Sequence, residues 1–140
     1  MLSYVCVISL PCLECQEALG MQSSVISDGQ ISASSEWDAH HAAIQGRLNF
    51  KKTGIKSGAW SSRTVDAKQW LQVDLGSYYN RVSRVATQGR NSHHQWVTEY
   101  QLQYGNNGVN FQYYRERRQT VNKVKKNESV VRFITISFEV

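Results

Sequence analysis

The chain has 140 residues, of which 41% are hydrophobic, 11% aromatic and 19% charged, with a formal net charge of +5. One Pro and nine Gly occur, and the composition excludes disordered, collagen-like and Pro-rich linker proteins while fitting one globular domain. No apolar run approaches the roughly 18 residues of a membrane-spanning helix, and no heptad pattern of a coiled coil persists.

The N-terminal segment is the first distinct element of the chain. Residues 1–13 are apolar with small residues, like the apolar region of a secretory signal that lacks a basic start. All three cysteines, Cys6, Cys12 and Cys15, lie within the first fifteen residues, and an odd number leaves at least one thiol outside an intrachain disulfide. We predict a signal-like or unstructured segment at 1–14, with a first buried strand as the alternative, and a single domain at 15–140.

Short apolar or alternating runs, separated by turn residues, follow one another from Ile31 onward. The clearest run, 69–75, alternates with period two and stops at Gly76. The turn cluster Gly105–Gly108 predicts a hairpin. The expected strands lie at 30–34, 69–75, 82–89, 96–104, 111–114 and 130–136. Without a helical stripe of period 3.6, these runs predict an all-β sandwich or barrel.

Seven segments between Leu19 and Glu116 point to one family when they are taken in order. They are LGM (19–21), ISDGQISASSEWDAHHAA (26–43), GRLNF (46–50), GAWSS (58–62), QWLQVDLG (69–76), VATQGR (85–90) and QWVTEYQLQYGNNGVNFQYY (95–114). Together they resemble the discoidin domain, also called the coagulation factor V/VIII type C domain. The resemblance implies a distorted jelly-roll β-barrel or sandwich and a secreted, non-enzymatic recognition or adhesion module at the cell surface or in the matrix.

The chain departs from the family pattern after residue 116. The resemblance implies a closing cysteine that pairs with one near the domain start, here Cys15, but no cysteine follows Cys15. The run at 130–136 matches the penultimate strand of the family, so the final strand is expected to be absent. A missing disulfide and an unpaired sheet edge predict a less stable domain, and Cys15 is expected to carry a free or intermolecularly paired thiol.

Enzyme and metal motifs are missing from the sequence. It has no G-x-S-x-G, H-E-x-x-H, P-loop or G-x-G-x-x-G motif, so we expect neither catalysis nor a cofactor. The doublets His40-His41 and His93-His94 are poor metal sites, because neighbouring residues on a strand point to opposite sides. The basic residues lack interleaved exposed aromatics, so nucleic acid is not an expected partner.

Three loops, 36–41, 50–56 and 91–95, form the candidate binding surface, since the resemblance places them at one end of the barrel. A planar aromatic face edged by His, Arg and Asn donors suits sugar hydroxyl groups, so cell-surface or matrix glycan is the main predicted ligand. The candidate ligand-binding residues are Trp37, His40, His41, Phe50, Lys51, Lys52, Ile55, Lys56, Arg90, Asn91, His93 and His94.

The loop FKKTGIKS supports anionic phospholipid, such as phosphatidylserine, as the alternative ligand. Phe50 and Ile55 are candidate apolar tips above a collar of lysines, an arrangement found in lipid-binding members of the family. One buried apolar side chain contributes about 1.5–3 kcal/mol and one basic residue near anionic lipid about 1 kcal/mol. One such loop binds marginally without a second module. A structural or assembly role, with homo-oligomers, is the third alternative.

The remaining residues of interest have structural interpretations. Trp60, Trp70 and Trp96 are expected in the core, whereas Trp37 stands in a polar loop as either a local plug or an exposed tip. Arg47 is expected to form a structural salt bridge or backbone contact. Asn127 begins the sequence Asn-Glu-Ser, an N-glycosylation motif expected at the surface of a secreted chain.

Overall fold

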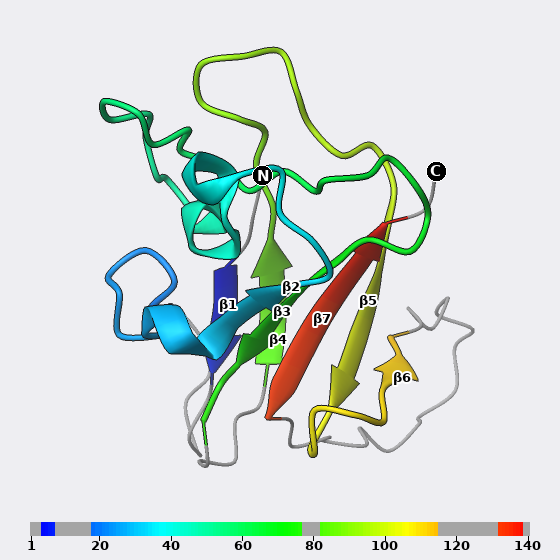
Figure 1. The fold of residues 1–140 in the computed structure, drawn as a ribbon. Coiled ribbons are helices and arrows are strands. Elements are labelled where there is room, and N and C mark those ends of the chain that lie inside the picture. The colour runs from blue at the N-terminus through cyan, green and yellow to red at the C-terminus, as the bar shows by residue number, and fades with distance from the viewer. Residues whose placement is uncertain (1–3, 8–17, 77–81, 115–131, 139–140) are drawn as a thin grey trace, which may run out of the picture.

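The structure, a computed structural model, describes residues 4–7, 18–76, 82–114 and 132–138. Its strands form two antiparallel sheets (Figure 1). The smaller sheet pairs β1 (Tyr4–Val7) with β4 (Val82–Ala86). The larger sheet has the order β2 (Ile31–Ala33), β3 (Trp70–Asp74), β7 (Phe133–Phe138), β5 (Tyr100–Gly105) and β6 (Gln112–Tyr113). The helical elements among the described residues are the short 3-10 helices η1 (Asp28–Gln30), η2 (Ala39–His41) and η3 (Ala43–Gly46).

The alternation in β3 explains how the larger sheet is built. Leu71 and Val73 are buried while the residues on either side of each are half-buried, and Val73 pairs with Ile31 on one side and Ile134 on the other. A slip of one residue would turn this apolar row to the opposite face, so the pattern fixes the register. The core residues are Met21, Ile26, Ile31, Ala43, Trp60, Leu71, Val73, Leu75 and Ile134.

The two sheets pack together as a sandwich. Val82 and Val85 of β4 are half-buried and lie against the core of the larger sheet. No strand among the described residues joins the two sheets into a closed barrel. The prediction of an all-β, discoidin-like fold is therefore confirmed in its sandwich form. Among the described residues, no helix has the length and apolar character needed to cross a membrane.

Most predicted strands are present, and the differences are local. The hairpin around Gly105–Gly108 is confirmed by the pairing of β5 with β6, and a strand, β1, lies within the N-terminal segment. The expected strand 96–104 begins only at Tyr100, which pairs with Phe138, because no described strand lies opposite 96–99. The core prediction for Trp96 is wrong, since its side chain is 63% exposed.

The strand register places the long loops at one end of the larger sheet. Trp70 of β3 pairs with Ser137 of β7, which in turn pairs with Gln101 of β5. The segment 34–69 enters β3, and the segment 87–99 enters β5, at this same level. Figure 1 shows both segments at the top of the molecule. We call this the loop end, and the turn between β5 and β6 lies at the opposite end.

Candidate binding surface

A buried glutamine holds the base of the first loop. Gln69 is 7% exposed. Both its amide oxygen and its amide nitrogen form hydrogen bonds with residues of neighbouring loops. Its Oε1 accepts from Ser34 Oγ at 2.8 Å and Ser35 Oγ at 2.5 Å. Its Nε2 donates to Thr64 Oγ1 at 2.8 Å and Asp66 Oδ1 at 2.9 Å. Because a buried amide is costly unless it is satisfied, Gln69 fixes the spacing of the 34–35 and 64–66 segments.

Trp37 stands out from this anchored base. Its backbone N–H donates to the Ser61 carbonyl at 2.8 Å, while its side chain is 62% exposed. Glu36 points inward instead, because its Oε1 accepts from the Ala43 N–H at 2.7 Å. The polar loop therefore presents an indole ring to solvent, and of the two sequence interpretations the structure supports the exposed tip.

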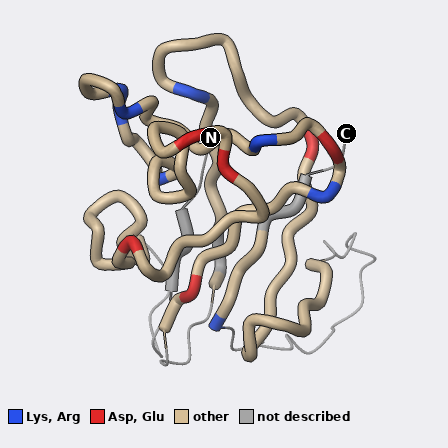
Figure 2. Tube along the Cα trace, viewed as in Figure 1, with Lys and Arg blue, Asp and Glu red and all other residues tan. Residues whose placement is uncertain are grey.

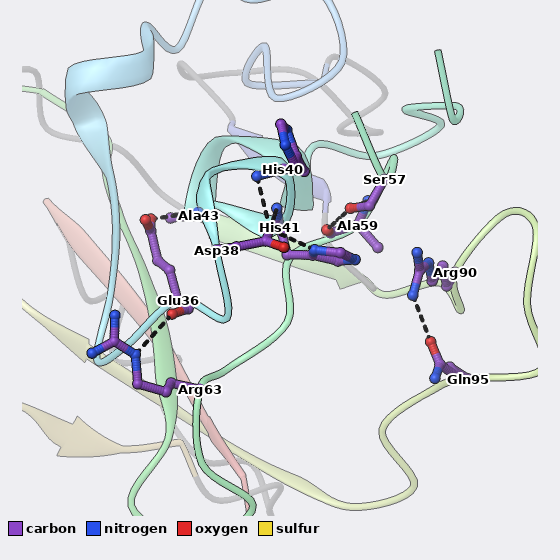
Figure 3. A network of polar contacts seen from close by, with 10 residues as sticks. All are labelled: Glu36, Asp38, His40, His41, Ala43, Ser57, Ala59, Arg63, Arg90 and Gln95. Atoms are coloured by element: carbon purple, nitrogen blue, oxygen red, sulfur yellow. Dashed lines mark hydrogen bonds and ion pairs between the residues drawn. The ribbon is translucent and has the colours of Figure 1, made fainter. Parts of the chain in front are cut away.

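Asp38 and the first histidine doublet form a local network (Figure 3). Asp38 Oδ1 accepts from the backbone N–H groups of His40 and His41 at 2.8 and 3.0 Å, and His41 Nδ1 lies 2.7 Å from the same oxygen. The His41 side-chain hydrogen bond, followed by these backbone bonds, lowers the pKa of Asp38. This network holds the His41 ring, whereas the exposed His40 imidazole has no partner among the described residues.

The second loop is a tight hairpin, residues 51–57, which we call the spike hairpin. Thr53 and Lys56 exchange two backbone hydrogen bonds, each 3.1 Å long, and Gly54 occupies the turn at a φ of +58°. Ile55 follows at the tip and is 75% exposed. At the base, the Ser57 N–H donates to the His40 carbonyl at 3.0 Å. Because hydrogen bonds hold both the turn and the base of this hairpin, Ile55 is exposed without further ordering of the loop.

Lysines surround this tip without neutralising partners. Lys51, Lys52 and Lys56 are exposed, and none of them forms an ion pair with the acids of the described chain. Figure 2 shows Lys and Arg positions along the upper-left loop, which is the segment that holds the spike hairpin in Figure 1. Phe50 differs from its predicted role as an apolar tip, because it is half-buried before the hairpin begins.

The third loop is closed by one arginine and one glutamine. The Arg90 N–H donates to the Gln95 carbonyl at 2.9 Å, Arg90 Nη1 donates to Gln95 Oε1 at 2.8 Å, and the Gln95 N–H donates to the His93 carbonyl at 2.8 Å. Asn91, His93 and His94 remain exposed. Arg90 thus stabilises this loop through Gln95, and its buried Nε has no hydrogen-bond partner among the described residues.

The third loop carries a histidine whose pKa responds to charges on the first two loops. The pKa of His93 is lowered by the positive charge of Arg90, then by burial, and then by the charges of Lys52 and His41. The charges of His41 in the first loop and Lys52 in the second therefore act on His93 in the third. In the described residues, no three His, Cys, Asp or Glu side chains come together as a metal site would require.

Other predicted residues lie apart from this surface or outside the described ranges. Arg47 is buried and structural, as expected, since its Nη2 lies 2.5 Å from Asp28 Oδ1 and its Nη1 donates to the Met21 carbonyl at 3.0 Å. Trp60 is in the core, and Trp70 is half-buried. The predictions for Asn127, Cys12, Cys15 and the segment 115–131 fall on residues outside the described ranges.

Two residues of this surface escape prediction from the sequence. Trp96 joins Trp37 as an exposed indole in the loops, but its position before a β-rich run suggested packing. Gln69 lies at the start of the alternating β3 run, where nothing in the sequence marks its four hydrogen bonds. To predict the exposure of Trp96 or the hydrogen bonds of Gln69, one must know which loops pack against each other.

Comparison with known proteins identifies the family. The F5/8 type C domain model matches residues 30–139. This chain belongs to the F5/8 type C family. Lactadherin of Rattus norvegicus is 34% identical over 108 residues, which cover 74% of this chain and 25% of that protein. The human EGF-like repeat and discoidin I-like domain-containing protein 3 is 36% identical over 124 residues, covering 79% of this chain and 24% of that protein.

The chain thus spans about a quarter of the length of these curated relatives. Among solved structures, recombinant discoidin II of Dictyostelium discoideum superposes with a TM-score of 0.53 at 23% identity, covering 78% of this chain and 48% of that one. This likeness supports the F5/8 type C fold, and the ligand has to be argued from the loops.

Proposed function

We propose that this F5/8 type C domain is a non-enzymatic extracellular module that binds anionic phospholipid surfaces through its loop end. The observation that carries the proposal is the spike hairpin, which presents an exposed Ile55 above unpaired lysines. An apolar tip suits insertion below the headgroups, and the lysines suit the negative surface of the membrane. Phosphatidylserine is the proposed headgroup class.

The expected contributions predict weak membrane binding by a single domain. Insertion of Ile55 contributes about 1.5–3 kcal/mol, and each lysine near the surface contributes about 1 kcal/mol. The hairpin is already closed, so it loses little conformational freedom on binding. Exposed Trp37 and Trp96 lie on the neighbouring loops, and indole rings favour the membrane–water interface. Further modules, as the lengths of the relatives suggest, would add avidity.

The first test is the change Ile55→Ser. We expect about tenfold weaker binding to phosphatidylserine-containing vesicles with an unchanged salt dependence, because only apolar burial is lost. Vesicle co-sedimentation across a lipid titration measures both quantities. Val109→Ser is the matched control, since Val109 is 79% exposed in the turn at the opposite end of the sheet. Equal binding of both variants and the parent would contradict insertion of Ile55.

Glycan remains the second candidate ligand, and a specific observation favours it. Trp37 is exposed, and the neighbouring His40 imidazole has no partner among the described residues. The other proposed sugar contacts are weaker, because Arg90 braces Gln95 and His41 bonds Asp38. A glycan array with the parent and Trp37→Ala distinguishes this candidate. Absence of both glycan and vesicle binding would favour a structural or assembly role.

A further inference from the structure

The turn between β5 and β6 contains the one Asn-Gly pair of the sequence, Asn107-Gly108. It lies at the end of the larger sheet opposite the loop end (Figure 1), so it is separate from the surface of the proposed function. The Asn107 side chain is exposed, and Gly108 is half-buried with a φ of +71°. The side-chain amide of an asparagine and the backbone nitrogen of the next residue can close a succinimide ring, so this pair is a candidate site of covalent change.

Two backbone donors hold the Asn107 side chain in the turn. Its Oδ1 accepts from the Val109 N–H at 3.0 Å and from the Asn110 N–H at 2.8 Å. Its Nδ2 has no hydrogen-bond partner among the described residues. The carbonyl oxygen is therefore fixed between two N–H groups, whereas the amide nitrogen is free to leave.

This arrangement favours nucleophilic attack on the Asn107 Cγ atom. N–H groups directed at a carbonyl oxygen stabilise the negative charge that develops on that oxygen during attack. The nucleophile is the Gly108 backbone nitrogen, whose N–H has no hydrogen-bond partner in the described part of the chain. Gly108 has no Cβ to obstruct ring closure, and the two reacting groups are neighbours in the chain, so no encounter is needed.

Three other exposed asparagines provide an internal comparison. Asn91, Asn106 and Asn110 all precede residues that carry side chains. The Asn106 Oδ1 accepts one backbone N–H, from Arg132 at 3.2 Å, and the Asn91 Oδ1 accepts the Ser92 hydroxyl at 3.3 Å. Among these four asparagines, Asn107 is the one that combines a glycine neighbour with two backbone donors on its carbonyl oxygen.

We propose that Asn107 is a self-modification site that converts to isoaspartate. The Gly108 nitrogen forms a bond to the Asn107 Cγ while the Cγ–Nδ2 bond breaks, and Nδ2 leaves as ammonia with the proton from the Gly108 nitrogen. Water then opens the succinimide. Cleavage of the bond between the ring nitrogen and the Asn107 backbone carbonyl carbon gives isoaspartate, and cleavage of its bond to Cγ gives aspartate. Asparagine and water thus become an acid and ammonia, and nothing is oxidised or reduced.

The isoaspartate product lengthens the main chain of the turn by one methylene group. Gly108 packs on the Phe133 ring of β7, where a Cβ atom would lie 3.2 Å from Phe133 Cζ. The strand after the turn, β6, has two residues and pairs with β5 alone among the described strands. A longer turn shifts Gly108 from the Phe133 ring and disturbs this short pairing. Conversion is therefore expected to release β6 from β5.

Mass spectrometry of the full chain, aged in neutral buffer, tests the site. Trypsin cleaves after Lys and Arg, so a single peptide, 91–115, contains all four asparagines. Fragment ions locate the new acid, and an isoaspartate-specific carboxyl methyltransferase identifies the isomer. We expect Asn107 to convert at least about tenfold faster than the other three, with isoaspartate as the main product. Equal rates at the four positions, or aspartate without isoaspartate, would overturn the proposal.

Unfolding in urea separates the effect of the turn from that of the Asn-Gly sequence. The two N–H groups are held on the Asn107 oxygen only in the folded hairpin, so the folded chain should convert at least as fast as the unfolded chain. Slower conversion in the folded chain would mean that the turn protects Asn107, contrary to the proposal. Asn107→Gln, which would need a larger ring, should show no isoaspartate in this peptide. An undiminished isoaspartate signal in that variant would place the reaction elsewhere and refute the assignment.

Hydrogen exchange tests the release of β6. The Tyr114 N–H donates to the Leu102 carbonyl at 2.7 Å, and in the purified isoaspartate form it should exchange about tenfold faster than in the parent. Asn107→Asp is the matched control, because it adds the charge, keeps the chain length and should exchange as the parent does. Equal exchange in the isoaspartate form and the parent, or equally fast exchange in the control, would contradict release by the longer turn. Vesicle binding reports on the proposed function separately, since the modified turn lies at the opposite end of the sheet.

Discussion

Replacement of Gly58 by alanine is expected to lower the free energy of unfolding by about 3 kcal/mol or more. Gly58 has a φ of +68°, in the left-handed region, which costs an L-residue about 1–2 kcal/mol. The added Cβ would also lie 2.6 Å from the Lys51 carbonyl carbon and the Lys52 nitrogen. These are backbone atoms and cannot turn aside, so the base of the spike hairpin must move. Denaturant unfolding of parent and variant measures the change.

Gly54→Ala is the matched control for this prediction. Gly54 also has a positive φ, +58°, but a Cβ there would meet nothing within 4 Å. Its expected cost is therefore the conformational part alone, about 1–2 kcal/mol. The difference between the two variants isolates the close contact at Gly58. Equal destabilisation would mean that the contact with the Lys51–Lys52 backbone does not restrain the hairpin.

The sequence predicts the strands well where burial alternates. β3 is recognisable because Leu71 and Val73 face the core while their neighbours face outward. The same logic fails at Trp96, where aromatic and β-branched residues suggest a strand. A strand needs a partner for its backbone, and the described residues provide none opposite 96–99. Propensity alone cannot show where pairing ends.

The loops show a similar division between local and tertiary information. Family resemblance was enough to place the segments 36–41, 50–56 and 91–95 at one end of the sheet, and composition was enough to select apolar and basic candidates. Composition could not show that Ile55 is exposed and Phe50 half-buried, because this difference depends on the hairpin that closes between Thr53 and Lys56. The brace of Arg90 on Gln95 and the contacts of Gln69 likewise exist only after distant segments have packed together.

The double change Lys51→Ala and Lys52→Ala is expected to weaken binding to phosphatidylserine vesicles by about 30-fold. Each lysine near an anionic surface contributes about 1 kcal/mol, and a difference of about 2 kcal/mol corresponds to that factor. Both side chains are exposed and without ion pairs in the described structure, so the free energy of unfolding should change little. Vesicle co-sedimentation and denaturant unfolding measure the two effects separately.

The salt dependence of vesicle binding is the second measurement for Lys51 and Lys52. The Debye length falls from about 8 Å at physiological ionic strength to about 3 Å at 1 M, so parent binding should weaken steeply with added salt and the double variant should respond less. Lys51→Arg with Lys52→Arg keeps both charges and should behave as the parent does. The Ile55→Ser variant should keep the parent's salt dependence, because its loss is apolar. If the alanine pair binds as tightly as the arginine pair, then charge on the spike hairpin does not hold the domain at the membrane.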